Sequence, residues 1–312
     1  MDDTVTETQA DPYPIGTPGQ PWREAERKAW LEQQSVKRSY RELAVDAIDG
    51  LGSMFVVDQY GQLDHDPARY PLLALRSMRW QAGLPTVLVT GGVHGYETSG
   101  VLGALRFLQT SAQQYEDKLN LVVAPCVSPW AFETVNRWNI DAIDPNRSFS
   151  SDSPAQESAA LVRYIASLDA ALAVHIDLHE TTDTDGSEFR PALAARDGEP
   201  PPEWEDIPDG FYLVGDSDNP QPEFQAAIIQ AVSRITHIAE PAADGTIIGE
   251  QPQQHGVINY PVKSLHLCAG MTSAPLTTTT EVYPDSPRVD GENCIRAQVT
   301  AVEAAIGYLL AT

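Results

Sequence analysis

The chain has 312 residues, of which 42% are hydrophobic, so it can build a sizeable core and is not a wholly disordered protein. Acidic residues outnumber basic residues by 44 to 20, which gives a formal net charge of −24. A field of this sign repels nucleic acids and anionic membrane surfaces, so we expect neither as a partner.

The cysteines and the start of the chain bear on the expected compartment. Cys126, Cys268 and Cys294 are odd in number and widely spaced, so neither a disulfide framework nor a thiolate zinc site is indicated. The first residues, MDDTVTETQADPYP, are acidic and lack the apolar core of a secretory signal. We also find no uninterrupted apolar run of the roughly 20 residues that span a bilayer. The sequence therefore predicts a reducing, cytoplasmic location.

Strand-like and helix-like segments alternate along the chain after a polar, proline-containing lead-in at residues 1–21, which we expect to be flexible. The runs predicted as strands are 54–59, 72–78, 86–92, 120–126, 171–179, 211–215 and 276–282. The segments predicted as helices are 22–48 with a break near Ser39, 97–112, 154–168, 223–238 and 289–310. The stretches predicted as long loops are 183–210 and 239–256.

This alternation predicts one α/β domain over residues 22–312. Its expected architecture is a three-layer sandwich, in which helices flank a mixed, mainly parallel central sheet.

A histidine and a carboxylate follow the buried strand predicted at 86–92. His94 lies just past the strand, and Glu97 lies at the start of the next helix. Side chains in this position meet at the carboxyl edge of a sheet, where α/β proteins form their sites. A tight bend at Gly95 would let the two side chains reach one metal ion. The alternative for this short pattern is a helix-capping glutamate beside an incidental histidine.

A second strand-end histidine favours the metal. In AVHIDLHET, alternation places His175, Asp177 and His179 on one face of the predicted strand, and burying them without partners would be costly. His94, Glu97 and His179 together would leave a fourth position for water, as catalytic zinc sites do. We therefore predict one zinc ion.

Two alternatives concern the same strand. His175 and Asp177 could bind a second metal, although a hydrogen bond from Asp177 that orients His179 is the favoured interpretation. The run from His179 to Asp183, HETTD, looks like a helical His-Glu-x-x-His zinc motif with its last histidine changed. A preceding β run and two internal threonines argue against the helix that this motif requires.

These residues resemble the zinc carboxypeptidase superfamily, including its succinylglutamate desuccinylase and aspartoacylase branch. The resemblance runs from about Thr86 to the C-terminus and rests on four blocks in the family's order: GGVHGYE, NRWNIDAIDPNRSF, DLHET and TTTTEV. It implies the predicted α/β fold and a zinc ion held by His94, Glu97 and His179.

The resemblance also implies roles for further residues. Asn146 and Arg147 would bind the substrate carboxylate, for which a guanidinium fork is well suited. Arg137 would polarise the scissile carbonyl, and Glu281 would be the general base that activates water. Tyr260, placed on the loop before the last strand, would cap the substrate.

Hydrolysis of an amide bond next to a free carboxylate is the predicted activity. A metallocarboxypeptidase acting on short peptides is the first choice. Tyr96 stands where the peptidases commonly carry an arginine, and this departure favours small substrates or an unusual subsite. An N-acyl amino acid deacylase of the aspartoacylase kind is the alternative, and a catalytically silent metal- or ligand-binding relative is a third. The sequence does not indicate the oligomeric state.

Overall fold

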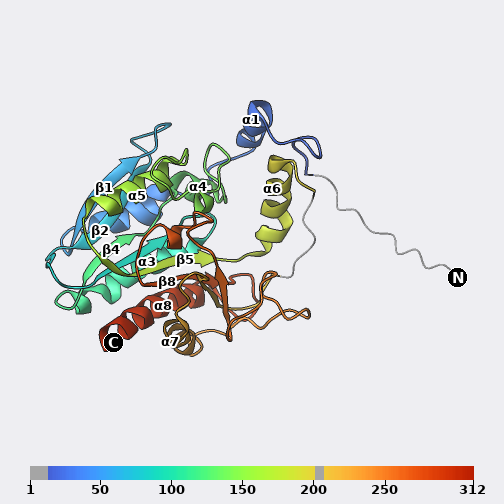
Figure 1. Cartoon of the computed structure of the whole chain (residues 1–312). Coiled ribbons are helices and arrows are strands. Elements are labelled where there is room, and N and C mark those ends of the chain that lie inside the picture. Colours follow the sequence, from blue (N-terminus) through green and yellow to red (C-terminus); the bar gives the residue numbers. More distant parts are fainter. Residues whose placement is uncertain (1–12, 201–206) are drawn as a thin grey trace.

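Within the described residues, 13–200 and 207–312, the computed structural model contains one central sheet of eight strands (Figure 1). The strands are β1 (Phe55–Gln62), β2 (Pro71–Ser77), β3 (Thr86–Gly91), β4 (Asn120–Ala124), β5 (Leu172–Glu180), β6 (Tyr212–Asp216), β7 (Val257–Tyr260) and β8 (Leu276–Val282). Their order is β1-β2-β4-β3-β5-β8-β6-β7. The four pairs β3–β4, β3–β5, β5–β8 and β6–β7 are parallel and the other three are antiparallel, which confirms a mixed sheet.

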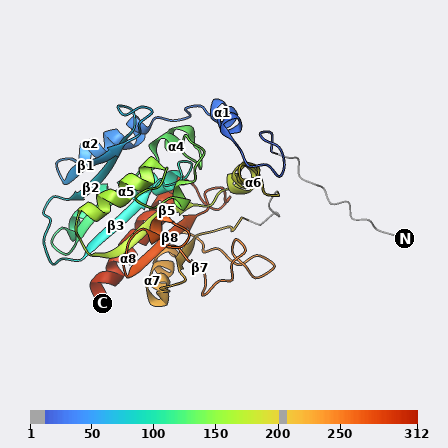
Figure 2. The same ribbon diagram turned by 45° about the horizontal axis from the view of Figure 1, so that its top comes forward.

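Helices cover both faces of this sheet (Figure 2). They are α1 (Glu24–Glu32), α2 (Asp46–Leu51), α3 (Thr98–Thr110), α4 (Pro129–Thr134), α5 (Gln156–Ser167), α6 (Arg190–Asp197), α7 (Pro222–Val232) and α8 (Gly291–Ala311). Val87 and Val89 belong to the core cluster that includes α3 and α8, whereas Leu88 packs with Tyr164 and Ile165 of α5. This alternation separates two apolar layers, and the three-layer prediction is confirmed.

Several segments differ from the sequence prediction, and two of them bear on the site. The predicted loop 183–210 contains a π-helical turn, Asp185–Phe189, followed by α6. Pro191 lies in the first turn of α6, and Gly198 ends the helix in the left-handed conformation with φ 73°. Proline and glycine are helix start and stop signals in these positions, and the prediction took them for loop residues. Tyr260 is the last residue of strand β7, not a loop residue.

The C-terminal helix α8 is the one helix of the described chain that is long and apolar enough to cross a membrane, by length and composition only. Arg296 and Glu303 interrupt its apolar sequence, so it does not stand out as an apolar run. In the structure α8 contacts α3 and α7, and its buried side chains include Val302 and Ile306. One face of α8 therefore packs against the rest of the domain.

The described part of the predicted lead-in, residues 13–21, lies against the domain. Ile15 is buried, and its carbonyl accepts a hydrogen bond from the buried Trp22 indole at 3.3 Å. The Trp22 backbone N–H donates to the Arg196 carbonyl at the end of α6, at 2.8 Å. The prediction for residues 1–12 lies outside the described residues.

Candidate metal centre

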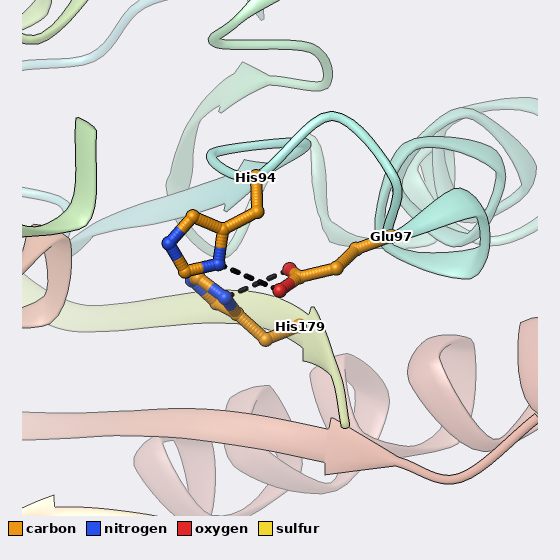
Figure 3. A group of neighbouring side chains, drawn as sticks. All are labelled: His94, Glu97 and His179. Carbon is orange, nitrogen blue, oxygen red and sulfur yellow. Dashed lines mark hydrogen bonds and ion pairs between the residues drawn. The ribbon is translucent and has the colours of Figure 1, made fainter. Parts of the chain in front are cut away.

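Three elements bring His94, Glu97 and His179 together at the carboxyl edge of the sheet (Figure 3). His94 lies on the loop after β3, Glu97 directly precedes α3, and His179 is the penultimate residue of β5. The loop can bend tightly because Gly95 packs directly on α4: a Cβ atom there would lie 1.9 Å from the Ala131 carbonyl carbon.

The donor atoms of this group face one another. His94 Nδ1 lies 2.7 Å from Glu97 Oε1, and His179 Nδ1 lies 2.8 Å from Glu97 Oε2. All three side chains are buried, and their ligand atoms lie within 4.8 Å of one another. Although burial alone raises the pKa of Glu97, the neighbouring His179 and His94 lower it to about 2.

The outer nitrogens of the two histidines test whether a metal fits. His94 Nε2 lies 3.0 Å from Asp144, and His179 Nε2 lies 2.7 Å from Asp177. With a metal bound, each Nε2 would donate its proton to the carboxylate beside it, which would leave each Nδ1 lone pair for the ion next to Glu97. Burial lowers the pKa of His179, but Asp177 and Glu97 raise it well above its ordinary value, so the surrounding carboxylates favour positive charge in this group. Consistently, the buried Glu97 Oε2 makes no hydrogen bond of acceptable geometry with the described residues. Two imidazoles and one carboxylate suit zinc.

Asp177 and His175, the pair considered for a second metal ion, both make hydrogen bonds within the described structure. One Asp177 oxygen accepts from His179, and the other accepts from the Thr90 hydroxyl at 2.6 Å. His175 Nε2 lies 3.1 Å from the same hydroxyl, and burial lowers the pKa of His175 to about 4. Asp177 therefore lies where it can orient His179.

Arg137 lies beside the metal group and is held by carboxylates. Its Nε donates to Asp144 at 3.2 Å, and its Nη1 donates to Asp185 at 3.1 Å and to the Tyr96 hydroxyl at 3.3 Å. Burial alone lowers the pKa of Arg137, but Asp144 and the other nearby anionic groups raise it well above its ordinary value. The guanidinium is therefore charged.

Glu281 lies on β8 directly opposite His179 of β5. Its carboxylate accepts a hydrogen bond from the Thr181 hydroxyl at 3.0 Å. Burial raises the pKa of Glu281 to about 8, although His179 opposes this shift. Glu281 is thus a carboxylate with raised proton affinity beside the metal group.

The metal group opens into a cavity of about 450 Å³. The predicted site residues that line it are His94, Glu97, Arg137, Asn146, Arg147, His179, Tyr260 and Glu281. Asn146 is fixed at its side-chain oxygen by the Cys268 N–H at 2.8 Å, and Arg147 Nη1 donates to the Asn146 carbonyl at 2.7 Å. The structure therefore brings all eight residues together, while Asp177 lies behind His179.

Three carboxylates around the site were missed by sequence reasoning. Asp144 carried a signal, since it starts the Asp-Pro-Asn-Arg run. Glu180 accepts from the Thr98 and Ser99 N–H groups at 3.0 and 2.7 Å, so it ties the end of β5 to the start of α3. Asp185 contacts Arg137 across 48 residues, which no local pattern predicts.

Comparisons with known proteins agree with this geometry. Residues 83–199 match the family model described as the succinylglutamate desuccinylase/aspartoacylase catalytic domain. No curated protein matches the chain significantly.

Several solved structures are similar to the chain. A provisionally assigned metallopeptidase from Shewanella amazonensis SB2B has 21% identity and a TM-score of 0.65, with 89% of this chain and 99% of that chain covered. A metallo-carboxypeptidase from Burkholderia cenocepacia has 15% identity and a TM-score of 0.55, with 93% and 70% covered. A metallo-carboxypeptidase from Pseudomonas aeruginosa, in complex with (2-guanidinoethylmercapto)succinic acid, has 16% identity and a TM-score of 0.56, with 85% and 68% covered. At these identities the likeness is one of fold.

Proposed function

We propose that this chain, which has the fold of the zinc carboxypeptidase superfamily, is a zinc-dependent hydrolase that cleaves an amide bond next to a free carboxylate. The observation that carries the proposal is one shared cavity. The three metal-binding side chains, the carboxylate of Glu281 and the guanidinium of Arg147 all open into it.

A bound zinc ion would polarise the carbonyl and lower the pKa of its water toward about 7. Glu281 would take the proton from the attacking water and deliver it to the leaving nitrogen. Arg137 would donate hydrogen bonds to the carbonyl oxygen as negative charge develops there. Arg147 and Asn146 would hold the free carboxylate and so select which end of the substrate is cleaved.

A carboxypeptidase of short peptides is our first choice of substrate class. Tyr96 closes the metal loop against Phe189, with ring centroids 4.6 Å apart, so an aromatic wall limits the room beside His94. The Pseudomonas aeruginosa neighbour is a carboxypeptidase bound to a succinic acid derivative, which supports recognition of a carboxylate in this fold.

An N-acyl amino acid deacylase is the second candidate. It is favoured by the match of residues 83–199 to the succinylglutamate desuccinylase/aspartoacylase model. Both activities would use the same metal group, base and carboxylate clamp, so the side chains named here are compatible with either.

A substrate panel on the zinc-loaded chain separates the two. Dipeptides and tripeptides are compared with N-acetyl and N-succinyl amino acids, and the release of C-terminal amino acid, acetate and succinate is measured. We expect peptide hydrolysis that is lost on chelation and in Glu281→Gln. Release of acetate or succinate alone would favour the deacylase. No turnover of either class, with zinc bound, would contradict the proposal and favour a silent relative.

A further inference from the structure

The segment that follows β5 supplies a carboxylate to the arginine of the site. Asp185 is the first residue of the π-helical turn Asp185–Phe189, and it is buried. Its Oδ1 accepts from Arg137 Nη1 at 3.1 Å and from the Tyr96 hydroxyl at 2.8 Å. This segment therefore reaches the side chain expected to face the scissile carbonyl.

The Asp185 carboxylate is itself fixed by its own turn. Its Oδ2 accepts from the Thr182 backbone N–H at 2.9 Å and from the Thr182 hydroxyl at 3.3 Å. The Tyr96 hydroxyl also lies within 3.0 Å of this oxygen. A carboxylate held from both sides is a rigid anchor, so it can restrain a guanidinium that would otherwise rotate.

The contacts of Arg137 are divided between two anchors. Nε binds Asp144, Nη1 binds Asp185 and Tyr96, and none of the described residues is hydrogen-bonded to Nη2. Asp144 also binds His94, so it serves the metal group as well. Among the described residues, Asp185 makes no hydrogen bond or ion pair with either histidine or with Glu97, so of the two anchors it is the one that holds Arg137 without also binding the metal group.

Tyr96 also takes part in holding Arg137. It stands where the peptidases of the superfamily commonly have an arginine, and here its hydroxyl bridges Asp185 and Arg137. Its ring stacks on His94, with centroids 6.0 Å apart and planes 12° apart. The change to tyrosine therefore comes with a new contact rather than with a gap.

We propose that Asp185 is a positioning residue that holds the Arg137 guanidinium so that Nη2 faces the scissile carbonyl oxygen. This inference rests on the proposed function in one respect, which is the role of Arg137 toward the substrate. A misplacement of about 1 Å in such a donor costs on the order of 100-fold in rate.

The test compares Asp185→Asn with wild type in the zinc-loaded full chain. Asparagine keeps the size and the acceptor oxygen but removes the charge. We expect kcat to fall about 10- to 100-fold while KM stays within about 2-fold, because the lost interaction acts in the transition state. Zinc per chain and the melting temperature report any general structural damage. Asp183→Asn is the matched control, since exposed Asp183 lies two residues away and accepts from Tyr283 instead, at 2.7 Å.

A second readout does not depend on activity. In ¹⁵N-arginine-labelled protein, the Arg137 side-chain resonance is assigned by its loss in Arg137→Lys. We expect rotation about the Arg137 Nε–Cζ bond to speed up at least about 10-fold in Asp185→Asn, because the ion pair is lost and the remaining hydrogen bond to the asparagine oxygen is weaker. Unchanged rotation, or an unchanged kcat in an active enzyme, would overturn the inference. If wild type hydrolyses neither substrate class, the proposed function fails, and the rotation rate still decides the role of Asp185.

Discussion

Replacing Glu157 with glutamine is expected to stabilise the protein above neutral pH. Glu157 is buried at the second position of α5, with one carboxylate oxygen that has no partner among the described residues. Burial raises its pKa from 4.5 to about 7, although Asn139 and the backbone oppose the shift. Asn139 in turn accepts from the Ile143 N–H, so this carboxyl supports the loop that leads to Asp144.

The pKa difference fixes the sign and size of the effect. A carboxyl whose pKa is raised by folding contributes its stability below pH 4.5 and loses it as the pH rises through about 7. Between pH 5 and pH 8 this loss amounts to about 2 to 3 kcal/mol of unfolding free energy. Glutamine does not ionise, so the variant escapes the loss.

Urea unfolding of wild type and Glu157→Gln at pH 5, 6, 7 and 8 measures the difference, and this range stays above the isoelectric point of about 4.4. The stability gap between the two proteins should grow by about 2 to 3 kcal/mol from pH 5 to pH 8. Glu223→Gln is the matched control, because exposed Glu223 is also the second residue of a helix, α7. A gap that is the same at both ends of the pH range would refute the reasoning.

Three further predictions concern the site. Glu281→Gln should keep one zinc per chain by metal analysis and lose about 100- to 10,000-fold in kcat, and near-normal turnover would remove Glu281 from its role as base. Asp177→Asn should weaken zinc binding about 10- to 100-fold in a chelator competition, because the hydrogen bond that orients His179 is weakened; equal affinity would contradict this role. Arg147→Ala should raise KM for substrates with a free carboxylate far more than for their amides, and a similar change for both would argue against a carboxylate clamp.

Most of the fold could be predicted because the spacing of apolar residues is a local property of the sequence. Val87, Leu88 and Val89 are all buried, and the strand is read from its continuous apolar run without knowledge of its neighbours. Helix α6 was missed because proline and glycine, here Pro191 and Gly198, occur both at the ends of helices and in loops. Contacts with residues distant in the sequence accompany the helix, such as the hydrogen bond from the Trp22 N–H to the Arg196 carbonyl.

The three expected metal-binding residues could be predicted from the sequence, but the carboxylates that surround them could not. His175, Asp177 and His179 alternate along one strand, so their common face follows from the strand geometry alone. Glu180 points to the other side of the same strand and caps α3. No residue near Glu180 in the sequence indicates this contact with a helix that begins 82 residues earlier. Contacts of this kind depend on how elements pack, which a local pattern does not contain.

Asp144 shows why the site behaves as one unit. Its Oδ1 lies 3.0 Å from His94 and accepts from the Asn146 N–H at 2.9 Å, while its Oδ2 accepts from Arg137. Burial alone would raise its pKa, but Arg137 and His94 hold it well below its ordinary value. The same carboxylate thus holds His94, the expected metal ligand, fixes Arg137 and caps the short turn that carries Arg147. Because one buried anion links the expected metal, oxyanion and carboxylate subsites, their relative positions are set before substrate arrives, as electrostatic catalysis requires.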